Sequence, residues 1–361
     1  MPTAPRPVMR ALQALVLLAL CASCFAHDVR IAVLGLFHTR EIVVQPVPAS
    51  AVVVRVGDRT LVLEQSSGND EIDVHLDGNV IAARTRDGAI RARSLTVVGR
   101  DHGPADFYLS IPGKITRRYH GTLEVTTSSG ALLAILSMDL ETAVASIVAA
   151  ESDPETPIEA LKAQAVAARS YLIAAKGRHS GFDFCDTTHC QFLRTPPDPH
   201  SPVARAAAST RGLVLAYNTQ PFAAMYTRSC SGRTRTPAEI GLPAGPYPYY
   251  SVECKYCREH PSAWQRSVTS QEAAHLRASS EAARLVIDRL LGWNTVPSNN
   301  YTVKRAGNRL LLDGVGEGHG IGLCQSGAAA MAKEGATFTQ ILAHYYPNSS
   351  VTKYVSGKLG M

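Results

Sequence analysis

The sequence predicts an α+β protein in which an antiparallel β-rich N-terminal domain precedes a mixed α/β domain. Two observations carry this prediction. Short β-branched runs separated by turn residues fill the chain between residues 29 and 121. Two amphipathic helical patterns follow within residues 139–176, and loops, strand-like runs and further helical patterns alternate after them. The predicted division is therefore a leader at 1–26, a β-rich domain at 27–121 and a second domain at 122–361.

The first 26 residues have the pattern of a secretory signal peptide. Two arginines precede an apolar run from Ala11 to Phe25, which is too short and wrongly flanked for a membrane span. Cleavage after Ala26 predicts an exported protein of the periplasm or cell envelope with no transmembrane segment. A lipoprotein anchor at Cys24 ranks second, because Cys21 stands where such a cleavage site normally has Leu.

The net charge of the chain limits the classes of binding partner that we expect. The formal net charge of the chain is +6. The leader contains two arginines and no acidic residue, so its removal lowers the net charge to +4. This mild basicity suits anionic cell-wall polymers or membranes and is too weak to predict a nucleic-acid partner.

The β-rich domain shows strand signals and no chemical motif. Turn signals include Gly57-Asp58, Asp77-Gly78 and Asp87-Gly88. A hairpin around Ser128–Gly130 opens the second domain and leads into the helices. The clearest strand runs are residues 29–34, 41–45, 52–56 and 60–63.

Two helices with a carboxylate at their junction follow the hairpin. Asp139 is placed to cap the first helix, which we expect to end near Glu151. Thr156 and Glu159 predict a capping box for the second helix, with Pro157 at its first position. Its predicted buried stripe and C-terminal signal are Ile158, Leu161, Ala165, Ala168 and Leu172, then Lys176-Gly177.

This arrangement gives one Glu on a short connection before a helix that carries Lys162, Gln164 and Arg169. From spacing alone, a solvated helix end and a charged surface face explain these residues better than a site does. Later elements include strand-like runs at 213–217 and 222–226, a helix at 277–291 and a short closing helix at 337–346.

Several motifs resemble, in order, the stage II sporulation protein D family, which includes amidase enhancers. The resemblance covers roughly residues 123–347. It rests on the run from Glu151 through Glu159-Ala-Leu-Lys-Ala-Gln-Ala-Val-Ala-Ala-Arg-Ser-Tyr, on Phe184-Cys-Asp-Thr-Thr-His-Cys-Gln191, Ala207-Ala-Ser-Thr-Arg-Gly212, Ala224-Met-Tyr-Thr-Arg-Ser-Cys-Ser-Gly-Arg-Thr234, Pro246-Tyr-Pro-Tyr-Tyr250 and Gly318-His-Gly-Ile-Gly-Leu-Cys-Gln-Ser-Gly-Ala328.

The resemblance implies a catalytic domain with a long cleft and lytic transglycosylase activity on peptidoglycan glycan strands stripped of their stem peptides. Such a reaction needs one acid/base carboxyl and no cofactor, because the C6 hydroxyl of N-acetylmuramic acid is the nucleophile. Glu151 is the expected acid/base, and it needs a protonated carboxyl near neutral pH. The residues expected to position the substrate or to orient the cleft by hydrogen bonds are Lys162, Gln164 and Arg169, with Tyr226, Ser229, His319 and Gln325 lining its far wall.

The glycine-rich run from Gly314 to Gly322 lacks the ending of a phosphate loop. Its glycines predict a tight turn that holds His319, which the family places beside the cleft, and a structural histidine is an equal alternative. Three departures from the family pattern put glycan stacking on this wall in doubt: Ser231, Glu317 and Ser326.

Six cysteines follow the predicted leader, which allows fifteen disulfide pairings in an oxidising compartment. The Cys254-Lys-Tyr-Cys257 run is also typical of a zinc half-site or redox pair. Family members imply a zinc held by His179, Cys185 and Cys190, and at these residues a structural zinc and a disulfide stay equally open.

Two other functions compete with glycan cleavage. The first is a non-catalytic amidase enhancer that binds peptidoglycan and stimulates an N-acetylmuramoyl-L-alanine amidase. The second, a metallohydrolase, is disfavoured because the sequence has no HExxH pair. The combination of Glu151 with Lys162, Gln164 and Arg169 favours the enzyme.

Overall fold

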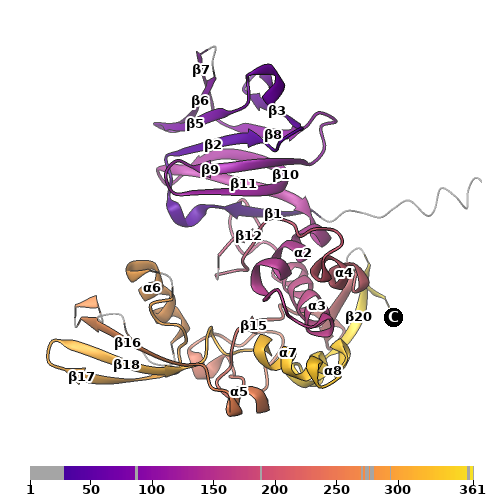
Figure 1. The fold of residues 1–361 in the computed structure, drawn as a ribbon, viewed down its shortest axis with the longest axis vertical. Coiled ribbons are helices and arrows are strands. Elements are labelled where there is room, and N and C mark those ends of the chain that lie inside the picture. The colour runs from indigo at the N-terminus through magenta and orange to yellow at the C-terminus, as the bar shows by residue number, and fades with distance from the viewer. Residues whose placement is uncertain are drawn as a thin grey trace, which may run out of the picture.

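The computed structural model describes residues 28–355 and 358–360, apart from 86–87, 188, 270, 273–275, 277–279 and 293. The predicted signal peptide, the Cys24 alternative and Asp87 lie outside the described residues. Figure 1 shows the β-rich unit at one end of the molecule, helices α2–α4 below it, and strands β16–β18 with α6 on an arm at the other end. The α+β class is confirmed.

Twelve strands build the β-rich unit, whose pairing is almost entirely antiparallel. Alternating residues point into one core, and the predicted early strands are confirmed. The strands are β1 (Asp28–Val33), β2 (Glu41–Pro46), β3 (Ala51–Val56), β4 (Arg59–Glu64), β5 (Ile72–Asp77), β6 (Val80–Thr85), β7 (Gly88–Ala92), β8 (Leu95–Gly99), β9 (Ala105–Ile111), β10 (Ile115–Ser128), β11 (Ala131–Asp139) and β12 (Phe184–Cys185).

The predicted boundary between residues 121 and 122 falls inside β10. The first half of β10 pairs with β9, and the second half pairs with β11 and β8. The strand changes partners at Gly121, whose φ is 150° and where a Cβ would collide with the Ser137 carbonyl. The change of sequence character near 121 therefore marks a bend in a continuous strand, and the β-rich unit extends to Asp139.

Helices α2 (Leu140–Glu151) and α3 (Ile158–Ala174) pack against each other directly after β11. Asp139 caps α2 as predicted, with Oδ1 accepting from the N–H groups of Glu141 and Thr142 at 3.0 and 3.1 Å. The capping box predicted for α3 is wrong: Pro157 is the N-cap and makes no side-chain cap. Glu159 instead accepts from Lys162 and from the Phe338 N–H.

Helix α3 lies between two cores, because its faces are both apolar. One face, including Leu161, Ala165 and Leu172, joins the core of the β-rich unit, while Ala163 and Ala167 join a second core with the C-terminal segments. The predicted stripe is buried except for Ile158, which is 38% exposed. The alanines allow close packing on both sides, so the orientation of α3 is fixed.

The remaining elements surround α3 or form the arm. The predicted helix at 337–346 is confirmed as α8, but it does not close the chain, because β20 follows and pairs with β13. Residues 222–225 are not a strand. The elements are α4 (Pro202–Ser209), β13 (Leu213–Tyr217), β14 (Gln220–Pro221), β15 (Tyr226–Thr227), α5 (Lys255–Glu259), β16 (Ala263–Thr269), α6 (Glu281–Leu291), β17 (Tyr301–Ala306), β18 (Arg309–Val315), β19 (Leu323–Cys324), α7 (Gln325–Lys333), α8 (Phe338–Tyr345), β20 (Ser350–Val355) and β21 (Lys358–Gly360), with 3-10 turns at Gly35–Phe37, Gln65–Ser67 and Ala238–Ile240.

Candidate active site around Glu151

Glu151 is the last residue of α2 and lines a cavity of about 50 Å³. It has room for a few water molecules. The cavity is lined by Glu151, Ser152, Asp153, Thr156, Ala160, Gln164, Arg228, Leu323, Gln325, Ser326, Ala328 and Ala329.

The main chain of Glu151 is held by two side chains from two distant segments. Its carbonyl is in the last turn of α2 and has no partner within the helix. Gln325 Nε2 donates to this oxygen at 3.0 Å, and Arg228 Nη1 donates at 3.4 Å. Arg228 also binds Asp153 through Nη2 at 2.6 Å. These contacts fix where the Glu151 side chain starts.

The carboxyl group of Glu151 has few partners. The Phe192 N–H donates to Oε1 at 3.1 Å. Burial raises the pKa of Glu151 to about 7, and the Phe192 N–H and the charges of Arg228 and Arg194 counter only part of this rise. Near neutral pH, the protonated carboxyl is therefore accessible at this position.

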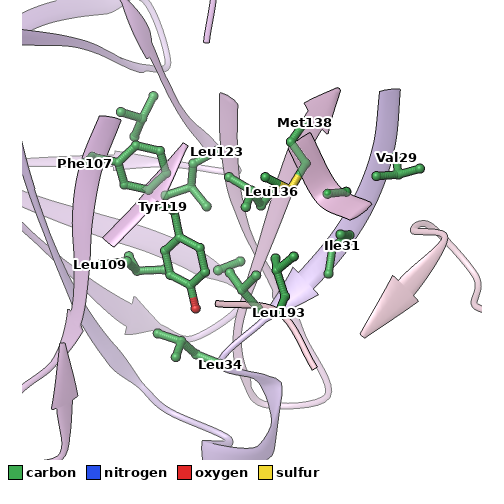
Figure 2. Packing of buried hydrophobic residues seen from close by; sticks show 14 of the residues in the cluster. Val29, Ile31, Leu34, Phe107, Leu109, Tyr119, Leu123, Leu136, Met138 and Leu193 are labelled. Carbon is green, nitrogen blue, oxygen red and sulfur yellow. The ribbon is translucent and has the colours of Figure 1, made fainter. Parts of the chain in front are cut away.

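Phe192 reaches Glu151 because its neighbour is anchored in the core. Leu193 is 1% exposed and inserts among Leu34, Tyr119 and Leu136, as Figure 2 shows. Hydrophobic packing thus fixes this segment, and with it the direction in which the Phe192 N–H points. Sequence reasoning missed this contact because no local pattern indicates which residue a loop segment faces.

Gln164 and Gln325 line the same cavity as Glu151. The Gln164 side chain is 2% exposed, and neither its amide nitrogen nor its amide oxygen has a hydrogen-bond partner among the described residues. A buried amide without partners costs about 1–3 kcal/mol, so Gln164 is available for a ligand at a cost in stability. Gln325 begins α7 and lines the cavity wall opposite α3.

Tyr226 and His319 lie next to each other, and neither is among the residues that line the cavity. The buried Tyr226 hydroxyl lies beside the Glu151 carboxyl and slightly lowers its pKa, while burial and the Glu151 charge raise the pKa of Tyr226. His319 does not line the cavity: its Nδ1 accepts from the Ile321 N–H at 3.0 Å, and burial lowers its pKa. The neutral His319 ring thus has a local structural partner.

Three predicted positioning residues have other roles. The guanidinium of Arg169 is fully buried and binds Glu141 and backbone carbonyls of Ala165, Ala207 and Leu213. This corrects its predicted substrate contact, because a glycan cannot reach it. Lys162 and Ser229 also stay away from the cavity: Lys162 pairs with Glu159 at 2.6 Å, and Ser229 Oγ lies 3.5 Å from Cys257 Sγ.

The residues predicted to hold zinc come together with one that the prediction omitted. His179, Cys185, His189 and Cys190 place one ligand atom each within 4.8 Å of one another. His179 Nε2 lies 3.3 Å from Cys190 Sγ, and His189 Nδ1 lies 3.7 Å from Cys185 Sγ. Two imidazoles and two thiols are a common donor set for structural zinc, so these residues fit the metal.

Comparisons with known proteins place this site in a family. Residues 128–217 match the family model of the stage II sporulation protein, SpoIID. This segment contains α2, α3, Glu151 and the His–Cys cluster. The chain carries a SpoIID domain.

Two relatives of this SpoIID chain come from Bacillus subtilis. Stage II sporulation protein D is 26% identical over 60% of this chain and 75% of its own length. An amidase enhancer is 26% identical over 55% of this chain and 38% of its own length. An uncharacterized protein of Brachyspira hyodysenteriae is 28% identical over 65% of this chain and 73% of its own length. Arg228, Gln325 and the C-terminal cysteines lie beyond the segment matched by the family model.

Proposed function

We propose that this protein is an exported lytic transglycosylase of the cell envelope that cleaves peptidoglycan glycan strands. The observation that carries the proposal is the raised pKa of Glu151, about 7, in a cavity that also contains an unpartnered amide, Gln164. The SpoIID family and the amidase-enhancer relative support a cell-wall role. No helix in the described residues is long and apolar enough to cross a membrane.

In the proposed reaction, Glu151 acts first as an acid and then as a base. Oε1 accepts the Phe192 N–H, which favours the proton on Oε2. Oε2 donates this proton to the glycosidic oxygen as the bond from C1 of N-acetylmuramic acid breaks. The C6 hydroxyl oxygen then bonds to C1 and gives its proton to the Glu151 carboxylate, which forms the 1,6-anhydro ring and regenerates the acid.

Neighbouring groups support both halves of this reaction. Arg228 and Gln325 hold the backbone of Glu151 without forming an ion pair with its carboxylate, so the carboxyl keeps its raised pKa. The Gln164 amide supplies a donor and an acceptor for a sugar hydroxyl or acetamido group. Gln164 is therefore the residue we assign to substrate positioning.

Asp153 offers a second carboxylate and hence an alternative chemistry. Its side chain is 65% exposed and is bound by Arg228 at 2.6 Å. A hydrolase with two carboxylates would use Glu151 as acid and the second group as base or nucleophile. The products separate the two reactions, because hydrolysis leaves a reducing end and transglycosylation leaves an anhydro end.

We also propose that His179, Cys185, His189 and Cys190 bind a structural zinc. The loop they form ends two residues before Phe192, so a metal there stiffens the segment that donates to Glu151. Four protein ligands leave no open position, and no step of the reaction passes through this metal.

The test is digestion of amidase-treated peptidoglycan, with mass spectrometry of the soluble products. The wild type should release 1,6-anhydro-muramyl products, and Glu151→Gln should reduce their rate about 10²–10⁴-fold. Asp153→Asn is the matched control on the same cavity, and it should retain anhydro products. Reducing-end products that vanish in Asp153→Asn would replace the transglycosylase with a hydrolase.

The relative named amidase enhancer supports a second function, in which the protein stimulates an N-acetylmuramoyl-L-alanine amidase without cleaving glycan. The same preparation decides between them. A folded wild type that releases no glycan fragment, yet accelerates stem-peptide release by an added amidase in both wild-type and Glu151→Gln forms, would establish the enhancer.

A further inference from the structure

A second cluster of four cysteines lies outside the family-model segment. Cys230, Cys254, Cys257 and Cys324 place their sulfur atoms within 4.8 Å of one another, and Cys257 Sγ and Cys324 Sγ are 3.4 Å apart. None of the four residues is more than 2% exposed. The cluster is therefore closed to solvent and formed entirely by protein groups.

Three separate segments bring these cysteines together. Cys230 follows β15, the pair Cys254 and Cys257 brackets the start of α5, and Cys324 ends β19 and N-caps α7. Backbone contacts hold the segments in place: Thr227 pairs with Cys324 in a parallel bridge, and the Cys254 N–H donates to the Gly232 carbonyl at 2.9 Å. The convergence of the sulfurs therefore has support from the backbone.

The mutual spacing of the sulfurs fits a metal better than disulfides. A disulfide needs two sulfurs about 2.05 Å apart, and two disulfides would sort the four atoms into two pairs. A tetrahedral zinc with Zn–S bonds of about 2.3 Å places all six sulfur pairs about 3.8 Å apart. Because all four sulfurs are mutual neighbours, we propose that Cys230, Cys254, Cys257 and Cys324 bind a structural zinc ion as a tetrathiolate.

The surroundings of the cluster suit thiolate ligands. The Tyr345 hydroxyl lies 3.5 Å from Cys254 Sγ, and the Ser229 hydroxyl lies 3.5 Å from Cys257 Sγ. Ser262 Oγ donates to Ser229 Oγ at 3.1 Å, which leaves the Ser229 hydrogen free to point at the sulfur. Hydroxyl donors of this kind orient and stabilise zinc-bound thiolates.

Gly327, in the first turn of α7, makes room for the cluster. A Cβ at this position would lie 2.5 Å from Cys254 Sγ and would collide with the Tyr345 hydroxyl. Any larger residue would push either the ligand or its hydroxyl partner out of place. The absence of a side chain at 327 is thus a geometric requirement of the site.

The zinc would connect the two segments that hold Glu151. Cys230 is two residues from Arg228, and Cys324 directly precedes Gln325, and both of these neighbours donate to the Glu151 carbonyl. A metal that binds Cys230 to Cys324 would therefore fix the distance between the two donors. With four protein ligands and no open position, its role is positional.

The first measurement is the zinc content of the purified full chain. The double variant Cys254→Ser/Cys257→Ser should lose one zinc equivalent per chain relative to wild type. The matched variant Cys185→Ser/Cys190→Ser should keep that equivalent, since it removes only ligands of the His–Cys cluster. Equal zinc content in the Cys254/Cys257 variant and wild type would overturn the proposal, as would iron in place of zinc.

A second measurement uses the wild type alone and does not depend on the folding of variants. The chain is denatured without reductant in the presence of a chelator, alkylated, and digested for mass spectrometry. The proposal expects alkylation at all four cysteines. Alkylation at these positions only after reduction would show two disulfides and would exclude the tetrathiolate, whatever the activity of the protein.

Discussion

The two ends of helix α2 each carry a glutamate, and the two residues have opposite environments. Glu141 in the first turn accepts from buried Arg169 at 2.6 and 3.0 Å and from the Gly212 N–H at 3.1 Å. Glu151 in the last turn accepts one backbone N–H, and its pKa is raised to about 7. The helix dipole also favours an anion at the first end and disfavours it at the second.

Helix α3 causes the difference, because it runs back along α2. It places the cation of Arg169 opposite Glu141 and the neutral amide of Gln164 in the cavity of Glu151. A glutamate on this helix is therefore a structural ion at position 141 and a protonatable acid at position 151. The groups that surround each carboxyl, rather than the residue type, decide which role it has.

The largest expected effect is on unfolding free energy and comes from a substitution at the Glu141 end of α2. Glu141→Gln leaves the fully buried guanidinium of Arg169 without its carboxylate, which should cost about 3–5 kcal/mol of unfolding free energy. Urea denaturation at pH 7 measures this loss. Glu151→Gln is the matched substitution at the other end and should show no such cost. A loss below about 1 kcal/mol for Glu141→Gln would mean that this pair behaves like a surface ion pair.

The next effect concerns the pH dependence of stability at the Glu151 end. The pKa is about 4.3 in the unfolded chain and about 7 in the fold, so the folded state binds more protons between these values. The contribution of Glu151 to the free energy of unfolding should therefore fall as the pH rises from about 4 to 7. Above pH 7 the whole loss of stability should persist.

Glu151→Gln removes this titration. Denaturation midpoints of wild type and variant should agree near pH 4, and the variant should be more stable by about 1–3 kcal/mol at pH 8. A difference that does not change with pH would show that the pKa of Glu151 is close to its unfolded value. The glycan-cleaving rate should also decline above pH 7, as the acid form is lost.

Sequence patterns predicted the features that local interactions determine. The Asp139 cap and the end of α2 at Glu151 both depend on residues within one helical turn. The strand turns at Gly57 and Gly78 also depend on neighbouring residues, and both glycines have positive φ values. These features need no knowledge of the tertiary fold.

The site was harder to predict because its residues come from distant segments. Arg169 was assigned to substrate positioning on the resemblance, and nothing local indicated that its partner is Glu141, 28 residues away. Arg228 stood within a recognised motif, but nothing local indicated that it faces Glu151, 77 residues earlier. His189 adjoins the predicted ligand Cys190, and its position in the sequence was the available signal.

The smallest expected change in stability comes from a substitution that tests whether the Gln164 amide binds a ligand. Its buried amide has no partner among the described residues, so Gln164→Leu should raise the unfolding free energy by about 1 kcal/mol. The same change should lower anhydro-product formation about tenfold or more, because the cavity loses its amide.

Gln191 supplies the matched control. Its amide is also buried and unpartnered among the described residues, but it does not line the Glu151 cavity. Gln191→Leu should therefore give a similar gain in stability with no change in product formation. If both variants lose activity equally, the effect of Gln164 comes from the fold. If only Gln164→Leu loses activity, the neutral amide of Gln164 contacts the substrate at the Glu151 end of α2. Arg169 would then have the structural role at the other end, where it contacts Glu141.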